Sequence, residues 1–182
     1  MDSQGHAAAP ASHSLPASRQ EGRVAVPVDI NAVARDAIRL AQLDGEAPIE
    51  LRASFFDPLP RVEGSSEQLA RALCNLLVNA RKSLDGIDGG VIEIETEPDG
   101  DLVAVRILDN GPGMSEDLLE QIFDPFGSGG ASDNGPDGKQ PKDTCGLFDA
   151  YEILRDHCGT LMVRSRPGEG TCFVALIPIQ GD

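Results

Sequence analysis

The chain has 182 residues, of which 40% are hydrophobic and 4% aromatic, with no Trp, so we expect one folded domain with a core of Leu, Ile, Val and Ala. The net charge of -15 repels nucleic-acid phosphates and anionic lipid, which argues against a polynucleotide partner. No apolar run approaches the roughly 18 residues of a membrane span and the start lacks the features of a signal peptide, so the expected location is cytoplasmic.

The first 27 residues differ in composition from the rest. Residues 1–27 are rich in Ala, Ser, Pro and Gly and show almost no apolar periodicity, so they cannot offset their ordering entropy by burial. We interpret them as a disordered tail and expect the domain over residues 28–182.

The period of the apolar residues predicts the elements of this domain in chain order. They are a helix capped by Asp29, a strand over 49–56, a long helix from Ser65 or Ser66 to about Leu84, strands over 91–96 and 102–109, a short helix from about 115 to 122, a helix over 145–157, and strands over 160–165 and 171–177. Pro98-Asp99-Gly100 is a turn sequence that suits a hairpin between the strands over 91–96 and 102–109.

The order of these elements predicts an α/β (α+β) two-layer sandwich, in which helices cover one face of a mixed, mainly antiparallel sheet. Gly127–Lys142 has no apolar anchor. A loop of that length inside a compact domain is usually functional, so we interpret it as a lid.

The four cysteines, at 74, 145, 158 and 172, form no C-x-x-C pair and are expected to be reduced, small core residues. A zinc site is the alternative, but only His157 lies near any of them in the sequence.

The long helix carries a second, polar face. At about 100° per residue, Asn75, Asn79 and Lys82 fall in one sector nearly opposite the Leu stripe. An amide oxygen suits Mg²⁺ and a lysine can meet phosphate oxygens. The alternative for this helix alone is an ordinary solvated face.

A carboxylate ends an apolar strand at Leu108-Asp109-Asn110-Gly111-Pro112-Gly113-Met114. The two glycines would let backbone approach a ligand closely, and a buried carboxylate can accept a hydrogen bond from the exocyclic amine of adenine. The alternative is an Asx turn that simply ends the strand.

Five segments together resemble the catalytic ATP-binding domain of sensor histidine kinases, in the superfamily that includes gyrase-type ATPases and related chaperones. They occur in the family's order and at its separations: Leu73–Lys82 (LCNLLVNARK), Ile107–Met114 (ILDNGPGM), Ile122–Phe126 (IFDPF), Cys145-Gly146-Leu147 and Gly168–Phe173 (GEGTCF). The resemblance covers roughly Val28 to Pro178.

This resemblance implies roles for particular residues, with ATP and Mg²⁺ as the bound cofactors. Asn79 matches the magnesium-binding asparagine, and Asp109 matches the aspartate that reads adenine. The other matches are Asn75 one helical turn earlier, Lys82 at a phosphate contact, Gly111 and Gly113 beside the aspartate, Gly146 and Leu147 at the end of the second glycine cluster, Thr171 in support of the adenine site, and Phe123 and Phe126 as anchors at the first hinge of the lid.

One position discriminates within the superfamily. Gyrase-like ATPases resemble one another in carrying a water-activating glutamate one turn before the magnesium asparagine, where this chain has Asn75. An amide cannot act as that general base, so phosphoryl transfer or nucleotide binding is favoured over hydrolysis.

The chain departs from the family in its second glycine cluster and in its histidines. The cluster usually reads G-x-G-L-G-L, but the matching stretch, residues 142–147, is KDTCGL, so side chains replace glycines that approach the phosphates. His6 and His13 lie in the polar tail, and His157 resembles the start of a His-Gly-Gly element of the family. None lies in the helical hairpin that normally carries the phosphate.

These observations favour the ATP-binding catalytic module of a two-component histidine kinase, active in signal transduction through a phosphorelay. It would act on a phosphoacceptor histidine in trans or on another segment, and a response-regulator receiver domain would be a further partner. The alternatives are a degenerate adaptor that binds no nucleotide and docks a receiver or phosphotransfer domain, and an anti-sigma-type serine kinase with the same fold.

Overall fold

The computed structural model describes residues 26–43, 49–121 and 145–179. The helices in this part are α1 (Ile30–Leu40), α2 (Ser66–Ser83), α3 (Glu116–Gln121) and α4 (Cys145–Asp156). The strands are β1 (Pro27–Val28), β2 (Glu50–Phe55), β3 (Val62–Glu63), β4 (Val91–Asp99), β5 (Leu102–Asp109), β6 (Thr160–Arg166) and β7 (Gly170–Pro178). Residues 1–25 of the predicted tail, the predicted lid, Phe123 and Phe126 lie outside the described residues.

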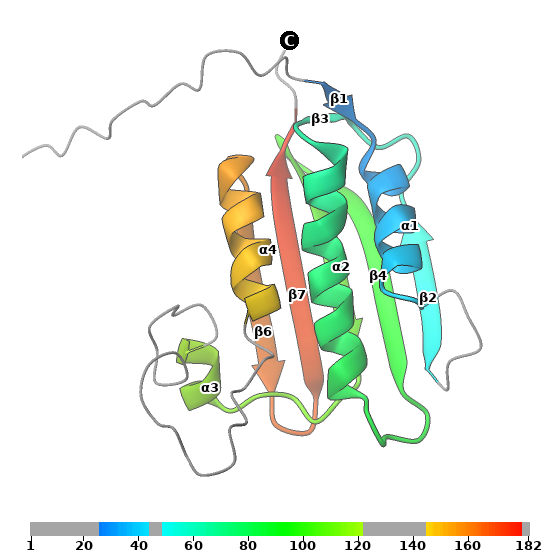
Figure 1. Ribbon diagram of the computed structural model, residues 1–182, viewed down its shortest axis with the longest axis vertical. Coiled ribbons are helices and arrows are strands. Elements are labelled where there is room, and N and C mark those ends of the chain that lie inside the picture. The colour runs from blue at the N-terminus through cyan, green and yellow to red at the C-terminus, as the bar shows by residue number, and fades with distance from the viewer. Residues whose placement is uncertain (1–25, 44–48, 122–144, 180–182) are drawn as a thin grey trace, which may run out of the picture.

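Five strands form the main sheet in the order β2-β4-β5-β7-β6. The β2–β4 pair is parallel, and the pairs β4–β5, β5–β7 and β6–β7 are antiparallel. Helices α1, α2 and α4 lie side by side against one face of this sheet, as Figure 1 shows. The predicted two-layer α/β sandwich with a mixed, mainly antiparallel sheet is confirmed.

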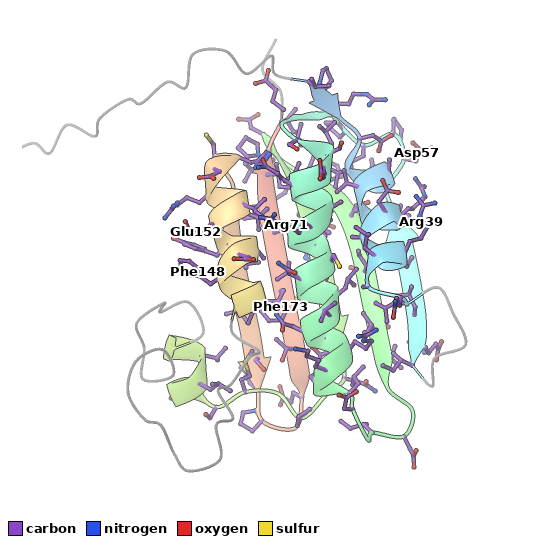
Figure 2. All side chains as sticks on the ribbon, viewed as in Figure 1. Arg39, Asp57, Arg71, Phe148, Glu152 and Phe173 are labelled. Carbon is purple, nitrogen blue, oxygen red and sulfur yellow. The ribbon has the colours of Figure 1, made fainter. Side chains whose placement is uncertain are left out.

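The core fills the space between the two layers. The apolar stripe predicted on α2 is almost completely buried, with Leu69, Leu73, Leu76 and Leu77 at 0% exposure. Along β5 and β7 every second side chain faces this helix layer, as the period of a strand requires. Phe173, which is 3% exposed, lies on β7 beneath the helices α2 and α4 (Figure 2).

A second, small sheet was not predicted. The two-residue strands β1 and β3 pair antiparallel, with Val28 opposite Val62, and Val62 also bridges to Ile179 after β7. Two residues are too few to show a period of two, so the sequence alone does not reveal these strands. The bridge brings the first and last described segments together at one end of the main sheet.

The turn between β4 and β5 differs from the predicted one. Asp99 pairs with Leu102, so the turn consists of Gly100 and Asp101, and Pro98 lies inside strand β4. The neighbour β2 pairs with β4 only as far as Thr96. Because the backbone of Pro98 faces no β2 partner, its missing N–H costs no ladder hydrogen bond.

Two helices end in the same hydrogen-bonded motif. After α1 the N–H of Gln42 donates to Arg39 and that of Leu43 to Ile38; after α4 the N–H of Cys158 donates to Arg155 and that of Gly159 to Leu154. These are Schellman motifs, whose penultimate residue adopts a left-handed conformation. Gln42 and Cys158 have φ of 57° and 56°.

The prediction that the cysteines are core residues is wrong for Cys158, which is exposed, because it occupies the turn after α4. Cys74 and Cys172 are half-buried free thiols. The side chain of Cys145 lies outside the description. Among the helices described, none is both long and apolar enough to cross a membrane.

Candidate functional site

The site is built around Asp109, the last residue of β5. The strand alternation turns Asp109 toward the helix layer, where its side chain is 7% exposed. Its Oδ1 accepts hydrogen bonds from the backbone N–H of Gly111 at 2.9 Å and from the hydroxyl of Ser83, the last residue of α2, at 3.0 Å. A buried carboxylate is thus fixed between a strand end and a helix end.

Burial raises the pKa of Asp109 above its ordinary value, because the charged form loses water. Hydrogen bonds from Gly111, Ser83 and the backbone of Thr171 act against this rise by stabilising the carboxylate. A carboxyl group held in this way is typical of functional sites, where stability is given up for chemistry.

The two glycines after Asp109 are required by the protein's own packing. A Cβ on Gly111 would lie 2.7 Å from Asp109 Oδ1 and 2.8 Å from Ser83 Oγ. A Cβ on Gly113, which has φ of +69°, would lie 1.9 Å from the carbonyl oxygen of Arg166, the last residue of β6 before the β6–β7 turn. The sequence suggested that these glycines make room for a ligand, whereas the contacts in the structure are with Asp109, Ser83 and that turn.

A hydroxyl pair attaches this loop to the sheet. Ser165 Oγ accepts from the N–H of Met114 at 2.8 Å and donates to the carbonyl of Gly170 at 2.8 Å. It also lies 2.9 Å from Thr171 Oγ1, and Thr171 is opposite Asp109 in the β5–β7 register. Ser165 therefore holds the predicted site residue Thr171 and the loop after Asp109 in one arrangement.

The polar face of α2 leads toward Asp109. Asn75, Asn79 and Ser83 are four residues apart, so they lie one above another along the helix. Asn75 and Asn79 are half-buried and Lys82 is exposed. The Nδ2 atom of Asn79 is buried and has no hydrogen-bond partner among the described residues. Within this part of the chain, Nδ2 therefore contributes no hydrogen bond to the fold.

The first turn of α4 lies beside Asn75. A Cβ on Gly146 would approach Asn75 Cβ to 3.7 Å. The neighbouring Leu147 is 6% exposed and belongs to the hydrophobic core. Of the two predicted residues from the second glycine cluster, Gly146 is therefore next to the polar face of α2, while the side chain of Leu147 packs inward.

A cavity of about 460 Å³ opens at the same end of the sheet. It is lined by Asp109 and Thr171 together with Leu108, Leu119, Arg164, Ser165, Arg166, Glu169, Gly170 and Cys172. Its size is in the range of small-ligand pockets. Leu108, Arg164 and Cys172 alternate with Asp109, Ser165 and Thr171 along the strands, so the cavity reaches the face of the sheet away from the helices. Its described lining does not include Asn75, Asn79 or Lys82, which lie on the helix side.

Comparison with known proteins decides the family. The model of the family described as "Histidine kinase-, DNA gyrase B-, and HSP90-like ATPase" matches residues 64–181. This range contains every site residue named above. The chain belongs to this family. The relatives and solved structures described below are sensor histidine kinases and their catalytic domains, so within this family the chain resembles the histidine-kinase type.

Two relatives illustrate the relationship. The sensor histidine kinase ZraS of Escherichia coli (strain K12) is 29% identical over 153 residues, covering 84% of this chain and 30% of that protein. The alginate biosynthesis sensor protein KinB of Pseudomonas aeruginosa is 34% identical over 136 residues, covering 74% of this chain and 21% of that protein. The chain thus spans less than a third of the length of these curated relatives.

Solved structures agree in fold. The mycobacterial sensor histidine kinase MprB superposes with a TM-score of 0.67 at 24% identity, covering 87% of this chain and 100% of that one. A nucleotide-free catalytic domain of histidine kinase ThkA gives a TM-score of 0.66 at 22% identity, covering 87% and 99%.

His157 has a structural position in this kinase-type domain. Its Nε2 accepts a hydrogen bond from the N–H of Ser65 at 3.1 Å, and its Nδ1 lies 2.7 Å from the carbonyl oxygen of Ile153. Gly64 leaves room for the ring, because a Cβ there would lie 2.2 Å from it. Both ring nitrogens are engaged, and the histidine links the end of α4 to the start of α2.

Sequence reasoning missed two residues of the site, Ser83 and Ser165. Ser83 continues the four-residue spacing of Asn75 and Asn79, a signal that could have found it. Ser165 has no such signal, because its role depends on the pairing of β6 with β7 and on the loop after Asp109.

Proposed function

We propose that this chain is the ATP-binding catalytic module of a two-component histidine kinase, which holds Mg-ATP and presents the γ-phosphate to a histidine on another domain or chain. A response-regulator receiver domain would be a further partner in the phosphorelay. Phosphoryl transfer asks little covalent chemistry of the protein, so the module acts by positioning and charge neutralisation.

The observation that carries this proposal is the buried carboxylate of Asp109, which faces the helix layer and is held by Ser83 at the end of the polar face of α2. The Ser83 and Gly111 hydrogen bonds both end on Oδ1. The backbone of Thr171 also stabilises the carboxylate. In this proposal the carboxylate accepts a further hydrogen bond, from the exocyclic amine of adenine, through Oδ2. Thr171 and the glycines at 111 and 113 support this carboxylate.

The phosphates would lie along the polar face of α2. Lys82 is a point charge for phosphate oxygens, and Asn75 provides amide donors beside Gly146. The first turn of α4 starts there, and the N–H groups of a helix start attract anions. Leu147 would support this end of the site through its packing rather than by direct contact.

The residues present fit a magnesium ion that arrives with the nucleotide. The Nδ2 atom of Asn79 has no hydrogen-bond partner among the residues that the structure describes, so the side chain can turn its oxygen to a hard cation. Within the described residues no group of three His, Cys, Asp or Glu side chains is placed to hold a metal. Mg²⁺ commonly keeps several waters and binds through few protein ligands plus phosphates, where it neutralises charge on the transferring group.

Transfer is proposed in preference to hydrolysis because of Asn75. Its amide has no basic lone pair with which to activate water. The histidine that receives the phosphate would belong to another domain or chain, because His157 is engaged at both nitrogens.

The test is calorimetric titration of ATP, with and without Mg²⁺, into the wild-type chain, Asp109→Asn and Asn79→Ala. We expect saturable binding that weakens at least tenfold in Asp109→Asn, because an amide there presents a donor to the adenine amine. In Asn79→Ala the affinity should lose its dependence on Mg²⁺.

Asp101→Asn is the matched control, since Asp101 is an exposed carboxylate in the turn at the opposite end of the sheet. It should bind ATP as the wild type does. If a folded wild-type sample binds no ATP up to millimolar concentration, the proposed function is refuted and the adaptor that binds no nucleotide is favoured. If ATP binds, transfer is tested by adding a separately purified phosphoacceptor-hairpin domain and radiolabelled ATP.

A further inference from the structure

The hydroxyl of Ser83 has two possible acceptors and one hydrogen. Its Oγ lies 2.8 Å from the carbonyl oxygen of Ala80 and 3.0 Å from Asp109 Oδ1. A carboxylate can only accept hydrogen bonds, so Ser83 serves Asp109 when it donates toward the site. A hydrogen bond to the carbonyl oxygen of Ala80 would by itself satisfy this hydroxyl without Asp109.

Asp109 Oδ1 has a second donor besides Ser83. The N–H of Gly111 donates to this oxygen at 2.9 Å, and a Cβ on Gly111 would collide with both Oδ1 and Ser83 Oγ. The two donors hold Oδ1, and the close packing at Gly111 leaves little room for the carboxylate to turn.

We infer that Ser83 is a positioning residue that fixes the Asp109 carboxylate with Oδ2 toward the ligand and thereby makes the site select an amine-bearing purine. This inference rests on the proposed function. It assigns the selectivity for adenine to a helix residue as well as to the aspartate itself. Without the Ser83 donor the carboxylate would be free to turn or to hold a proton, and a protonated oxygen would tolerate a carbonyl at C6.

The experiment compares ATP with inosine triphosphate, which carries a carbonyl in place of the C6 amine. Affinities are measured by calorimetry for wild type, Ser83→Ala and Ser83→Cys. We expect Ser83→Ala to bind ATP about five- to tenfold more weakly, while its affinity for inosine triphosphate changes less than twofold, so the ratio of the two affinities falls. Ser83→Cys keeps the size and a weak donor and should lie between.

A double-mutant cycle shows whether Ser83 acts through Asp109. In an Asp109→Asn background the change Ser83→Ala should alter ATP affinity less than twofold, because the carboxylate it positions is gone. Ser66→Ala, at the exposed start of the same helix, is the control and should change neither affinity nor selectivity. Circular dichroism melting confirms that each variant is folded, and Ser83→Cys replaces Ser83→Ala if the latter is not.

The outcomes separate the two proposals. A folded wild type that binds no ATP overturns the proposed function and this inference with it. If the wild type binds ATP through Asp109 and Ser83→Ala leaves the ratio of ATP to inosine triphosphate affinity unchanged, the inference alone is overturned. An equal loss for both nucleotides would mean that Ser83 supports only the structure of the helix end.

Discussion

Asp109 shows how a functional residue can work against the stability of the fold that carries it. Its charge is buried at 7% exposure, and charge burial without an ion partner costs free energy. The hydrogen bonds from Gly111, Ser83 and Thr171 reduce this cost, but the pKa of Asp109 is still raised. Under the proposed function, this cost in stability is offset by the binding of the nucleotide.

Asp109→Asn should make the folded chain more stable near neutral pH, by about 0.5–2 kcal/mol. Because the folded pKa is raised, the stabilising contribution of Asp109 is fully present below its unfolded pKa of about 3.9 and is lost as the pH rises through the folded value. The gain in Asp109→Asn should therefore be largest at pH 7 and shrink on acidification. Urea unfolding at pH 7 and pH 4.5 measures it, and a variant less stable than wild type at pH 7 would refute it.

At this scale the sequence predicts residues whose roles follow from a local motif. Asp109, Asn75 and Asn79 are found because their spacing and their strand or helix position can be read along the chain. Ser165 cannot be found in this way, since its partners Met114 and Thr171 meet only after β6, β7 and the loop have assembled.

Helix α2 serves the core and the site at once. One side carries the buried leucines, and the other carries Asn75, Asn79 and Ser83 at successive turns. The period of 3.6 residues makes both faces predictable, and the N-cap of α1 at Asp29, which accepts from Asn31 and Ala32, was likewise predicted. The period does not predict which other elements the ends of these helices contact in the folded chain.

The two Schellman endings carry residues that are poorly suited to them. Gln42 and Cys158 hold left-handed conformations, which glycine adopts without the steric penalty of a Cβ. We expect Gln42→Gly and Cys158→Gly each to raise the free energy of unfolding by about 0.5–1 kcal/mol, as measured by urea denaturation.

The matched comparison is glycine at an ordinary helical position. Arg39→Gly, inside α1, should lower stability by about 1 kcal/mol. If glycine at 42 or 158 proved as destabilising as at 39, the left-handed endings would not hold in solution.

At the scale of the whole molecule, long-range pairings decide the architecture. The parallel β2–β4 pair and the β5–β7 pair join strands that are far apart in sequence, so no local pattern specifies them. The layer order was nevertheless predicted, because the alternation of helices with hairpins permits few arrangements. The β1–β3 sheet was not predicted, because strands of two residues are too short to show a period in the sequence.

His157 is one of the residues that hold the helix layer together across the chain. His157→Ala should remove the acceptor for the Ser65 N–H and destabilise the fold by about 1–2 kcal/mol, with ATP affinity unchanged. Urea unfolding measures the change, and Asp156→Ala, exposed at the neighbouring position, is the control. Loss of phosphoryl transfer at unchanged stability would instead give His157 a chemical role.

The Val62–Ile179 bridge fastens both ends of the described fold at one end of the sheet, and Asp109 lies at the other, a strand length of about 25 Å away. A rotation of the domain by about 10° about the bridged end would move Asp109 through roughly 4 Å, comparable to the distance within which reacting atoms must be aligned. Under the proposed function, a rotation of this size would be enough to move a bound phosphate toward its acceptor or away from it.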